Sequence, residues 1–233
     1  MKIITKFNKF KKICESITSN FNDIQKDDYI FVKDNLNTEK GYFKVISTQT
    51  CNNTSNKDTI TVVKVDDEGI IFDETKSHFN ITTDDKYTIE KYETVKLGGI
   101  VFIYNNKIFL QKEGDDNGYY TFPGGHLEGD ETPKDGACRE TLEEIGIDIP
   151  QDMLNSNNVE ILNFFKPNKK QYCIYNFFIV RLNNKEFEKY FDGRLTLPKD
   201  NLNKKEVKHG GFYTKDVAEE KMNPPFNKLL KYL

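Results

Sequence analysis

The stretch GHLEGDETPKDGACRETLEEIGI, residues 125–147, decides the fold of the second half of this 233-residue chain. It carries its own helix signals. Thr132 is a side chain that caps helix starts, and Pro133 follows at the first helical position. Gly146 suits the left-handed conformation in which many helices end. The stretch therefore predicts a helix over about 133–145, preceded by a turn that contains glycine.

Acidic side chains gather on one side of this predicted helix. At about 100° per residue, Glu140, Glu143 and Glu144 fall within one arc. The opposite arc, predicted to pack, holds Cys138, Thr141, Leu142 and Ile145. Crowded carboxylates repel one another, and a divalent cation removes that cost. Oxygen ligands favour Mg²⁺ or Mn²⁺, because zinc and copper sites use Cys and His. The alternative is an acidic helix face in water, the usual role of a charge run.

The turn before the helix also fits a binding site. Its sequence, Phe122 to His126, contains two glycines that let the backbone turn sharply and approach a ligand, so a carbonyl there could join a metal shell. Arginine is rare in the chain, and Arg139 lies inside the acidic helix. Its planar fork is suited to hold Glu131 or a neighbouring glutamate in place.

The spacing of these residues resembles the Nudix box, the signature of the Nudix hydrolase superfamily. The box runs Gly, five residues, Glu, seven residues, Arg-Glu, an apolar residue, any residue, Glu-Glu, any residue, Gly and an apolar residue. The matching positions are Gly125, Glu131, Arg139, Glu140, Glu143, Glu144, Gly146 and Ile147. Thr141 departs from the pattern at an apolar position. The flanking segments also look like the family, so the resemblance covers roughly residues 94–233.

The resemblance implies a role for each residue of the box. Glu140 and Glu144 are implied as the leading ligands of Mg²⁺ or Mn²⁺, Glu143 as a ligand or a base, and the Gly124 carbonyl as a further ligand. Arg139 is implied to orient these groups together with Glu131. The general base varies across the family and often lies outside the box. Glu206, before the last predicted strand, is our candidate for it, and an exposed loop residue is the alternative.

Composition narrows the function classes. The formal charge is −3 and lysine is mixed with acid along the chain, so there is no broad basic surface for nucleic acid. Only residues 1–12 are basic, at the start of a predicted amphipathic helix that runs to Phe21. We expect that helix to dock through its apolar stripe, with a membrane or nucleic-acid contact as the alternative. No apolar run suits a signal peptide or a membrane span, and four scattered cysteines suit reduced thiols. We therefore expect an intracellular, cytoplasmic protein.

Two domains are predicted. Residues 1–93 hold the first helix and five short alternating runs, at about 27–34, 40–48, 58–65, 68–74 and 86–93. These runs indicate a small antiparallel barrel or sandwich with a structural, dimerising or substrate-shaping role. From residue 94 the order becomes mixed, with a hairpin about Asn105-Asn106, the acidic helix, a hairpin about Pro167-Asn168, a last strand and a helix begun by Pro224-Pro225. The fold class is therefore α+β. The resemblance implies that residues 94–233 form a Nudix-type mixed sheet between helices, preceded by a mostly-β N-terminal domain.

The function implied is metal-dependent hydrolysis of a diphosphate linkage in a nucleoside diphosphate derivative. A Nudix-type pyrophosphohydrolase acting on a nucleoside triphosphate or similar small nucleotide is the first interpretation. The alternatives are an ADP-ribose, dinucleotide or cap hydrolase, with RNA as a partner only in the last case, and, more distantly, a non-catalytic nucleotide-binding module. A homodimer and the absence of a membrane partner complete these expectations.

Substrate recognition is predicted to lie outside the box. Six aromatic residues could stack on a base, although aromatic residues at strand spacing are more often core. They are Tyr119, Tyr120, Phe164, Phe165, Tyr172 and Tyr175. The predicted loop from Asn183 to Lys205, with Phe191 and Arg194, is long enough to act as a lid or as a recognition element. His126 could touch the substrate from the loop, and a loop histidine with no catalytic role is the alternative.

Overall fold

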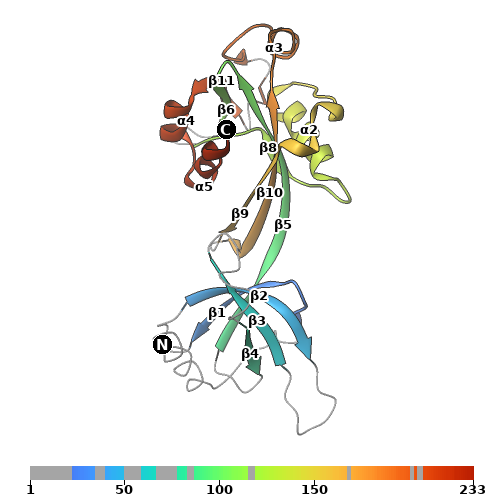
Figure 1. The fold of residues 1–233 in the computed structure, drawn as a ribbon, viewed down its shortest axis with the longest axis vertical. Helices are drawn as coiled ribbons and strands as arrows, with labels where there is room; N and C mark the ends of the chain where they lie inside the picture. Colours follow the sequence, from blue (N-terminus) through green and yellow to red (C-terminus); the bar gives the residue numbers. More distant parts are fainter. Residues whose placement is uncertain are drawn as a thin grey trace. The chain divides into compact units, whose positions relative to one another are not determined.

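The computed structural model divides the chain into two compact units, and each is described here by itself (Figure 1). The first comprises Met1–Thr94 and Asn163–Tyr172, and the second comprises Val95–Leu162 and Cys173–Leu233. The structure describes residues 23–34, 40–49, 59–66, 78–82, 87–114, 119–166, 169–199, 202–203 and 207–233. The predicted N-terminal helix and the predicted strand at 68–74 lie outside these ranges. None of the helices in the described ranges combines the length and apolar character needed to cross a bilayer.

The first unit is an antiparallel sheet. Its strands are β1 (Tyr29–Asp34), β2 (Lys40–Gln49), β3 (Thr59–Val65), β4 (His78–Thr82) and the first part of β5 (Tyr87–Tyr104). They pair in the order β5-β1-β2-β3-β4. Alternate residues point into a core that includes Ile30, Val45, Ile60 and Val62, each fully buried. The mostly-β character of this part is confirmed, whereas β4 lies where the sequence patterns predicted no strand.

The tip of a later hairpin belongs to this first unit. The two strands of that hairpin are β9 (Val159–Lys166) and β10 (Gln171–Arg181). At the tip, the ring of Tyr172 stacks on Tyr29 with centroids 3.7 Å apart, and Phe165 stacks on Tyr42 at 3.9 Å. Tyr92 of β5 meets Phe165 edge to face. We call these five residues the aromatic cluster. Its members lie far apart in sequence, so the first unit is not one continuous segment.

The second unit combines a sheet with helices on both sides. Its further strands are β6 (Lys107–Glu113), β7 (Tyr120–Thr121), β8 (Gly124–His126) and β11 (Val207–Thr214). Its helices are α2 (Pro133–Ile145), α3 (Asn184–Phe191), α4 (Lys215–Lys221) and α5 (Pro224–Asn227), with short 3₁₀ turns at Gln151–Met153, Ser156–Asn158 and Lys228–Tyr232. Figure 1 shows α2 on one side of the strands and α4 and α5 on the other. This arrangement confirms the predicted α+β fold class.

The first hairpin of the second unit is also confirmed. Strand β5 ends at Tyr104 and β6 begins at Lys107. The two turn residues, Asn105 and Asn106, have positive φ angles of 46° and 59°. Asparagine tolerates this left-handed conformation, and a turn of that kind matches the twist of the flanking strands. The hairpin fixes the strand that later supports the glycine loop.

The predicted long loop over residues 183–205 is wrong in its described part, because a helix, α3, forms there. Asn183 caps α3 by accepting hydrogen bonds from the Lys185 and Glu186 amides, and the Glu186 carboxylate accepts from the Asn183 amide. Phe187 and Phe191 are buried against the core on the sheet, so helical spacing of aromatic residues was overlooked in the sequence. Arg194, just beyond the helix, is exposed.

Candidate functional site

Helix α2 forms as its sequence predicts. It spans Pro133–Ile145, and the Thr132 hydroxyl accepts a hydrogen bond from the Asp135 amide while the Asp135 carboxylate accepts from the Thr132 amide. This reciprocal pair satisfies two amides that the helix start leaves open. At the other end, Gly146 has a φ of 71°, and its amide donates to the Leu142 carbonyl. Local signals alone therefore fix the helix that carries the acidic residues.

One face of α2 packs and the neighbouring face carries the glutamates. Thr141 and Ile145 are fully buried, and the Thr141 hydroxyl donates a hydrogen bond to the Ala137 carbonyl at 2.7 Å. The hydroxyl at the apolar position of the box is therefore tolerated. The prediction that Leu142 packs is wrong, because 48% of it is exposed. It follows Thr141 by one residue, about 100° around the helix and away from the sheet.

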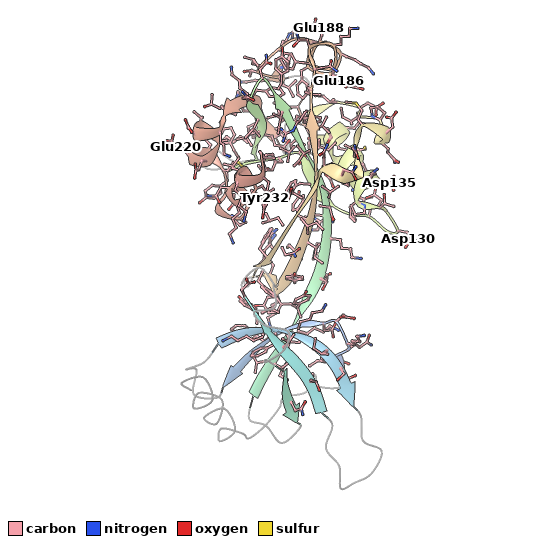
Figure 2. All side chains as sticks on the ribbon, in the orientation of Figure 1. Asp130, Asp135, Glu186, Glu188, Glu220 and Tyr232 are labelled. Atoms are coloured by element: carbon pink, nitrogen blue, oxygen red, sulfur yellow. The ribbon has the colours of Figure 1, made fainter. Side chains whose placement is uncertain are left out.

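Arg139 holds the acidic side chains of the site in place. In Figure 2, Asp135 marks the beginning of α2, and Glu220 lies on α4 on the other side of the sheet. Its Nε donates to Glu131 Oε1 at 2.8 Å, and its Nη2 donates to Glu131 Oε2 at 3.0 Å. Its Nη1 lies 3.0 Å from carboxylate oxygens of both Glu140 and Glu143. Nη2 also donates to the His126 carbonyl at 2.8 Å. This network confirms the predicted hold of Arg139 on Glu131 and ties the helix to the loop.

The ion pairs shift the acid–base properties of the network. The hydrogen bonds from Arg139 are the main reason that the pKa of Glu131 lies below its ordinary value. In turn, the hydrogen bonds to Glu131 raise the pKa of Arg139, since a nearby carboxylate favours the charged guanidinium. Both groups therefore stay ionised near neutral pH, and the ion pair between Glu131 and Arg139 forms without a ligand.

The glycine loop is held against β5. Strand β8 pairs antiparallel with β5, which places Gly98 opposite Gly125 and Gly99 opposite Gly124. Gly124 has a φ of 151°, and a Cβ built on it would lie 2.5 Å from the Gly98 carbonyl oxygen. Neither the space nor the backbone conformation admits a side chain. Sequence analysis singled out Gly124 and Gly125 but missed Gly98 and Gly99, although a glycine pair inside a strand pattern signals a close backbone approach.

The loop backbone and two glutamates meet at one place. The Gly124 amide donates to Glu144 Oε2 at 2.8 Å. A Cβ on Gly125 would lie 2.5 Å from the Glu140 carboxylate carbon, so the loop is as close to this side chain as glycine permits. Glu140 is only 16% exposed, whereas Glu143, held by Arg139, is 52% exposed. The structure therefore brings Glu140, Glu144 and the Gly124–Gly125 backbone together, with Glu143 at the margin.

The donor set fits a hard divalent cation in its chemistry. Glu140 and Glu144 lie one turn apart on α2, and the backbone of Gly124 and Gly125 lies beside them. Among the described residues, no three His, Cys, Asp or Glu side chains already converge as metal ligands. The carboxylates of Glu140 and Glu143 instead accept hydrogen bonds from Arg139, and that of Glu144 accepts one from the Gly124 amide. A bound cation would compete with these partners for the same oxygens.

The remaining candidates fall into three groups. Glu206 lies outside the described residues. Phe164, Phe165, Tyr172 and Tyr175 are buried, as their strand spacing favoured, whereas Tyr119 is 58% exposed. The His126 side chain is exposed, and its backbone carbonyl rather than its ring joins the Arg139 network.

Comparison with known proteins places this geometry in a family. Residues 96–227 match the model of the NUDIX domain. A segment of 56 residues is 39% identical to the 8-oxo-dGTP diphosphatase of Proteus vulgaris, covering 23% of this chain and 50% of that protein. A segment of 61 residues is 39% identical to a MutT-like protein of Streptomyces ambofaciens, covering 26% of this chain and 39% of that protein. The matched segments thus span half or less of these relatives. Among solved structures, the Ap4A hydrolase of C. elegans aligns with a TM-score of 0.45 and 19% identity over 59% of this chain and 93% of that one.

Proposed function

The chain belongs to the Nudix family, and we propose that it is a pyrophosphohydrolase that needs Mg²⁺ or Mn²⁺ and cleaves a diphosphate linkage in a small nucleotide. The observation that carries the proposal is the meeting of Glu140 and Glu144 with the glycine loop. A binding module without chemistry has no need to keep repelling carboxylates beside a backbone that admits no side chain. The family match over residues 96–227 supports the same assignment.

Each residue of the site has a distinct task in this proposal. Glu140 and Glu144 would hold the cation, with the Gly124 carbonyl as a further ligand. A divalent cation supplies charge neutralisation on the phosphates and a lowered pKa for water. Arg139 orients Glu140 and keeps Glu131 against the loop. Glu143, which is exposed by half, can accept a proton from water or serve as a ligand. Glu206 remains our second candidate for the base.

A nucleoside triphosphate is the substrate class that we put first. A relative that shares 39% identity over 56 residues is named for its action on 8-oxo-dGTP. Dinucleotides, ADP-ribose and capped RNA ends are the competing classes.

The test is a substrate screen with the full chain. Nucleoside triphosphates, including 8-oxo-dGTP, would be compared with ADP-ribose, dinucleoside polyphosphates and capped RNA, each with Mg²⁺, with Mn²⁺ and with chelator. Products would be separated by anion-exchange chromatography. We expect cleavage only with the metals, and turnover about 10²–10³-fold lower in Glu140→Gln and Glu144→Gln. Glu220→Gln, an exposed residue of α4, is the matched control. Cleavage in chelator, or full turnover in both site variants, would refute the proposal.

A further inference from the structure

A tyrosine hydroxyl lies beside the glycine loop. Tyr175 belongs to β10, which pairs with β5, and only 5% of the residue is exposed. A Cβ built on Gly124 would lie 3.0 Å from the Tyr175 hydroxyl oxygen. Since a carbon–carbon bond is about 1.5 Å long, this oxygen is within about 4.5 Å of the Gly124 Cα. The loop backbone therefore has next to it a polar side-chain group that comes from a strand far along the chain.

Ring contacts fix the position of this hydroxyl. The Tyr175 ring stacks on Phe177 with centroids 4.2 Å apart and planes 5° from parallel, and it meets Phe226 of α5 edge to face at 5.5 Å. Phe177 in turn meets Phe122 edge to face at 5.3 Å, and a Cβ on Gly99 would lie 2.9 Å from the Phe177 ring. Aromatic pairs of this kind prefer a few definite geometries. The tyrosine therefore has little freedom to move away from the loop.

Gly124 is held from two sides. On the side of α2, the Glu144 carboxylate accepts a hydrogen bond from the Gly124 amide at 2.8 Å. Tyr175 contacts Phe226 of α5, and Figure 1 shows α5 on the other side of the strands from α2. Because Gly124 has no side chain of its own, its position depends on the groups around its backbone. A change at Tyr175 therefore reaches Glu144 through a single residue.

We propose that Tyr175 is a positioning residue whose hydroxyl holds the Gly124 peptide where it meets Glu144, and that it thereby raises the affinity of the site for a divalent cation. The inference rests on the proposed function, because it concerns the cation that Glu140 and Glu144 would hold. The Tyr175 ring is not free to stack on a nucleobase, since it is buried and already stacked on Phe177. Its hydroxyl both donates and accepts hydrogen bonds, which suits a contact with a peptide group.

The first test follows the Gly124 amide in the absence of metal. The chain contains one Pro-Gly pair, Pro123-Gly124, so ¹³C-labelled proline carbonyls combined with ¹⁵N-labelled glycine select this amide alone in an NMR spectrum. Tyr175→Phe removes the hydroxyl and keeps the ring. In chelator, we expect the Gly124 amide to exchange with solvent about tenfold faster in this variant than in the parent, because its hydrogen bond to Glu144 opens more often.

Tyr104→Phe is the matched control. The Tyr104 ring is also stacked, on Phe187 with centroids 3.7 Å apart, and its hydroxyl donates to Asn184 at 3.2 Å. Tyr104 is the last residue of β5, whereas Gly124 pairs with Gly99 in the middle of that strand. The control therefore removes a tyrosine hydroxyl from the second unit but not from the loop, and its Gly124 amide should exchange as in the parent.

The second test measures Mn²⁺ binding by the full chain without a nucleotide. Free Mn²⁺ would be followed by electron paramagnetic resonance during a titration. We expect the Kd for Mn²⁺ to rise about tenfold in Tyr175→Phe and to stay at the parent value in Tyr104→Phe, since groups that orient metal ligands change metal affinity by about this factor. With an active parent, Tyr175→Phe should also raise the Mg²⁺ concentration for half-maximal activity, while the KM for the nucleotide at saturating Mg²⁺ stays near that of the parent.

The outcomes separate this inference from the proposed function. Equal Gly124 exchange in the parent and Tyr175→Phe would overturn the inference, even if metal-dependent hydrolysis were found. Equal Kd values, where both chains bind Mn²⁺, would overturn it as well. A raised KM for the nucleotide with exchange and Kd unchanged would show that the hydroxyl contacts the substrate and does not hold the loop. Faster Gly124 exchange in Tyr175→Phe, together with a parent that binds no Mn²⁺, would support the hold on the loop and count against the proposed function.

Discussion

Replacing Arg139 by lysine tests whether the guanidinium organises the acidic site. The change keeps the positive charge and removes only the planar fork. Arg139 donates through three nitrogens to Glu131, Glu140, Glu143 and the His126 carbonyl, at 2.8–3.0 Å. A lysine donates from one atom, so it cannot reach both oxygens of Glu131 and the groups on the opposite side at once.

The size of the effect follows from the contacts that are lost. At least two of the five hydrogen bonds cannot form. A hydrogen bond to a charged group contributes about 1.5–3 kcal/mol, and the lower end applies because 21% of the Arg139 side chain is exposed. The expected loss in the free energy of unfolding is therefore about 3 kcal/mol. Glu140 would also lose its fixed position, so the Mg²⁺ concentration for half-maximal activity should rise about tenfold.

Urea unfolding followed by circular dichroism gives the first quantity, and a Mg²⁺ titration of initial rates gives the second. Arg194→Lys is the matched control, since Arg194 is exposed and outside the site. If Arg139→Lys stayed within about 0.5 kcal/mol of the parent, the fork would have no organising role. An unchanged Mg²⁺ titration would likewise contradict the reasoning.

Four further predictions follow from the structure. Gly125→Ala should abolish metal-dependent turnover while the chain stays folded, because the new methyl collides with the neighbouring carboxylate of α2; normal turnover would show that the loop can yield. Gln111→Met should raise the free energy of unfolding by about 1–3 kcal/mol. The reason is that Gln111 is fully buried and neither atom of its side-chain amide has a hydrogen-bond partner among the described residues, and a lower stability of the variant in urea would contradict this. Folding lowers the pKa of Glu131, so the contribution of this carboxylate to stability is complete above the ordinary glutamate pKa and disappears as the pH falls below that value. Glu131→Gln should lose this part of the acid dependence, and an acid-unfolding curve equal to that of the parent would exclude the contribution. A chain of residues 94–233 should aggregate, as measured by light scattering, and replacing residues 163–172 in it by a short turn should prevent the aggregation. Equal scattering from both chains would show that exposed residues of the aromatic cluster do not cause the aggregation.

Features that depend on short stretches of sequence were predictable. The start of α2 at Thr132, its end at Gly146 and the turn at Asn105-Asn106 each require particular residues at particular positions, and all three were found where predicted. Arg139 and Glu143 belong to the same category, because a spacing of four residues on a helix brings the two side chains within reach of one another.

Features that depend on partners far along the chain were not predictable. Leu142 looks like a packing residue in the helix pattern, but its burial depends on where the sheet lies. Gly98 and Gly99 acquire their importance only when β8 pairs with β5. His209 and Lys112 are another case, since they come from separate strands that meet through sheet register. The roles of Glu143 and Glu206 remain predictions.

The attachment of residues 163–172 to the first unit affects how the chain can mature on the ribosome. The first unit includes residues up to Thr94, but it also needs Phe165 and Tyr172 to complete its aromatic cluster. Tyr172 leaves the ribosome 78 residues after Thr94 (172 − 94), a delay of about 4 to 16 seconds at ordinary synthesis rates. During that time three aromatic side chains of the nascent sheet, those of Tyr29, Tyr42 and Tyr92, lack the ring contacts that Tyr172 and Phe165 later supply. The sheet of the first unit therefore begins to form early, but its aromatic cluster can be completed only after most of the second unit's sequence up to Leu162 has also been made.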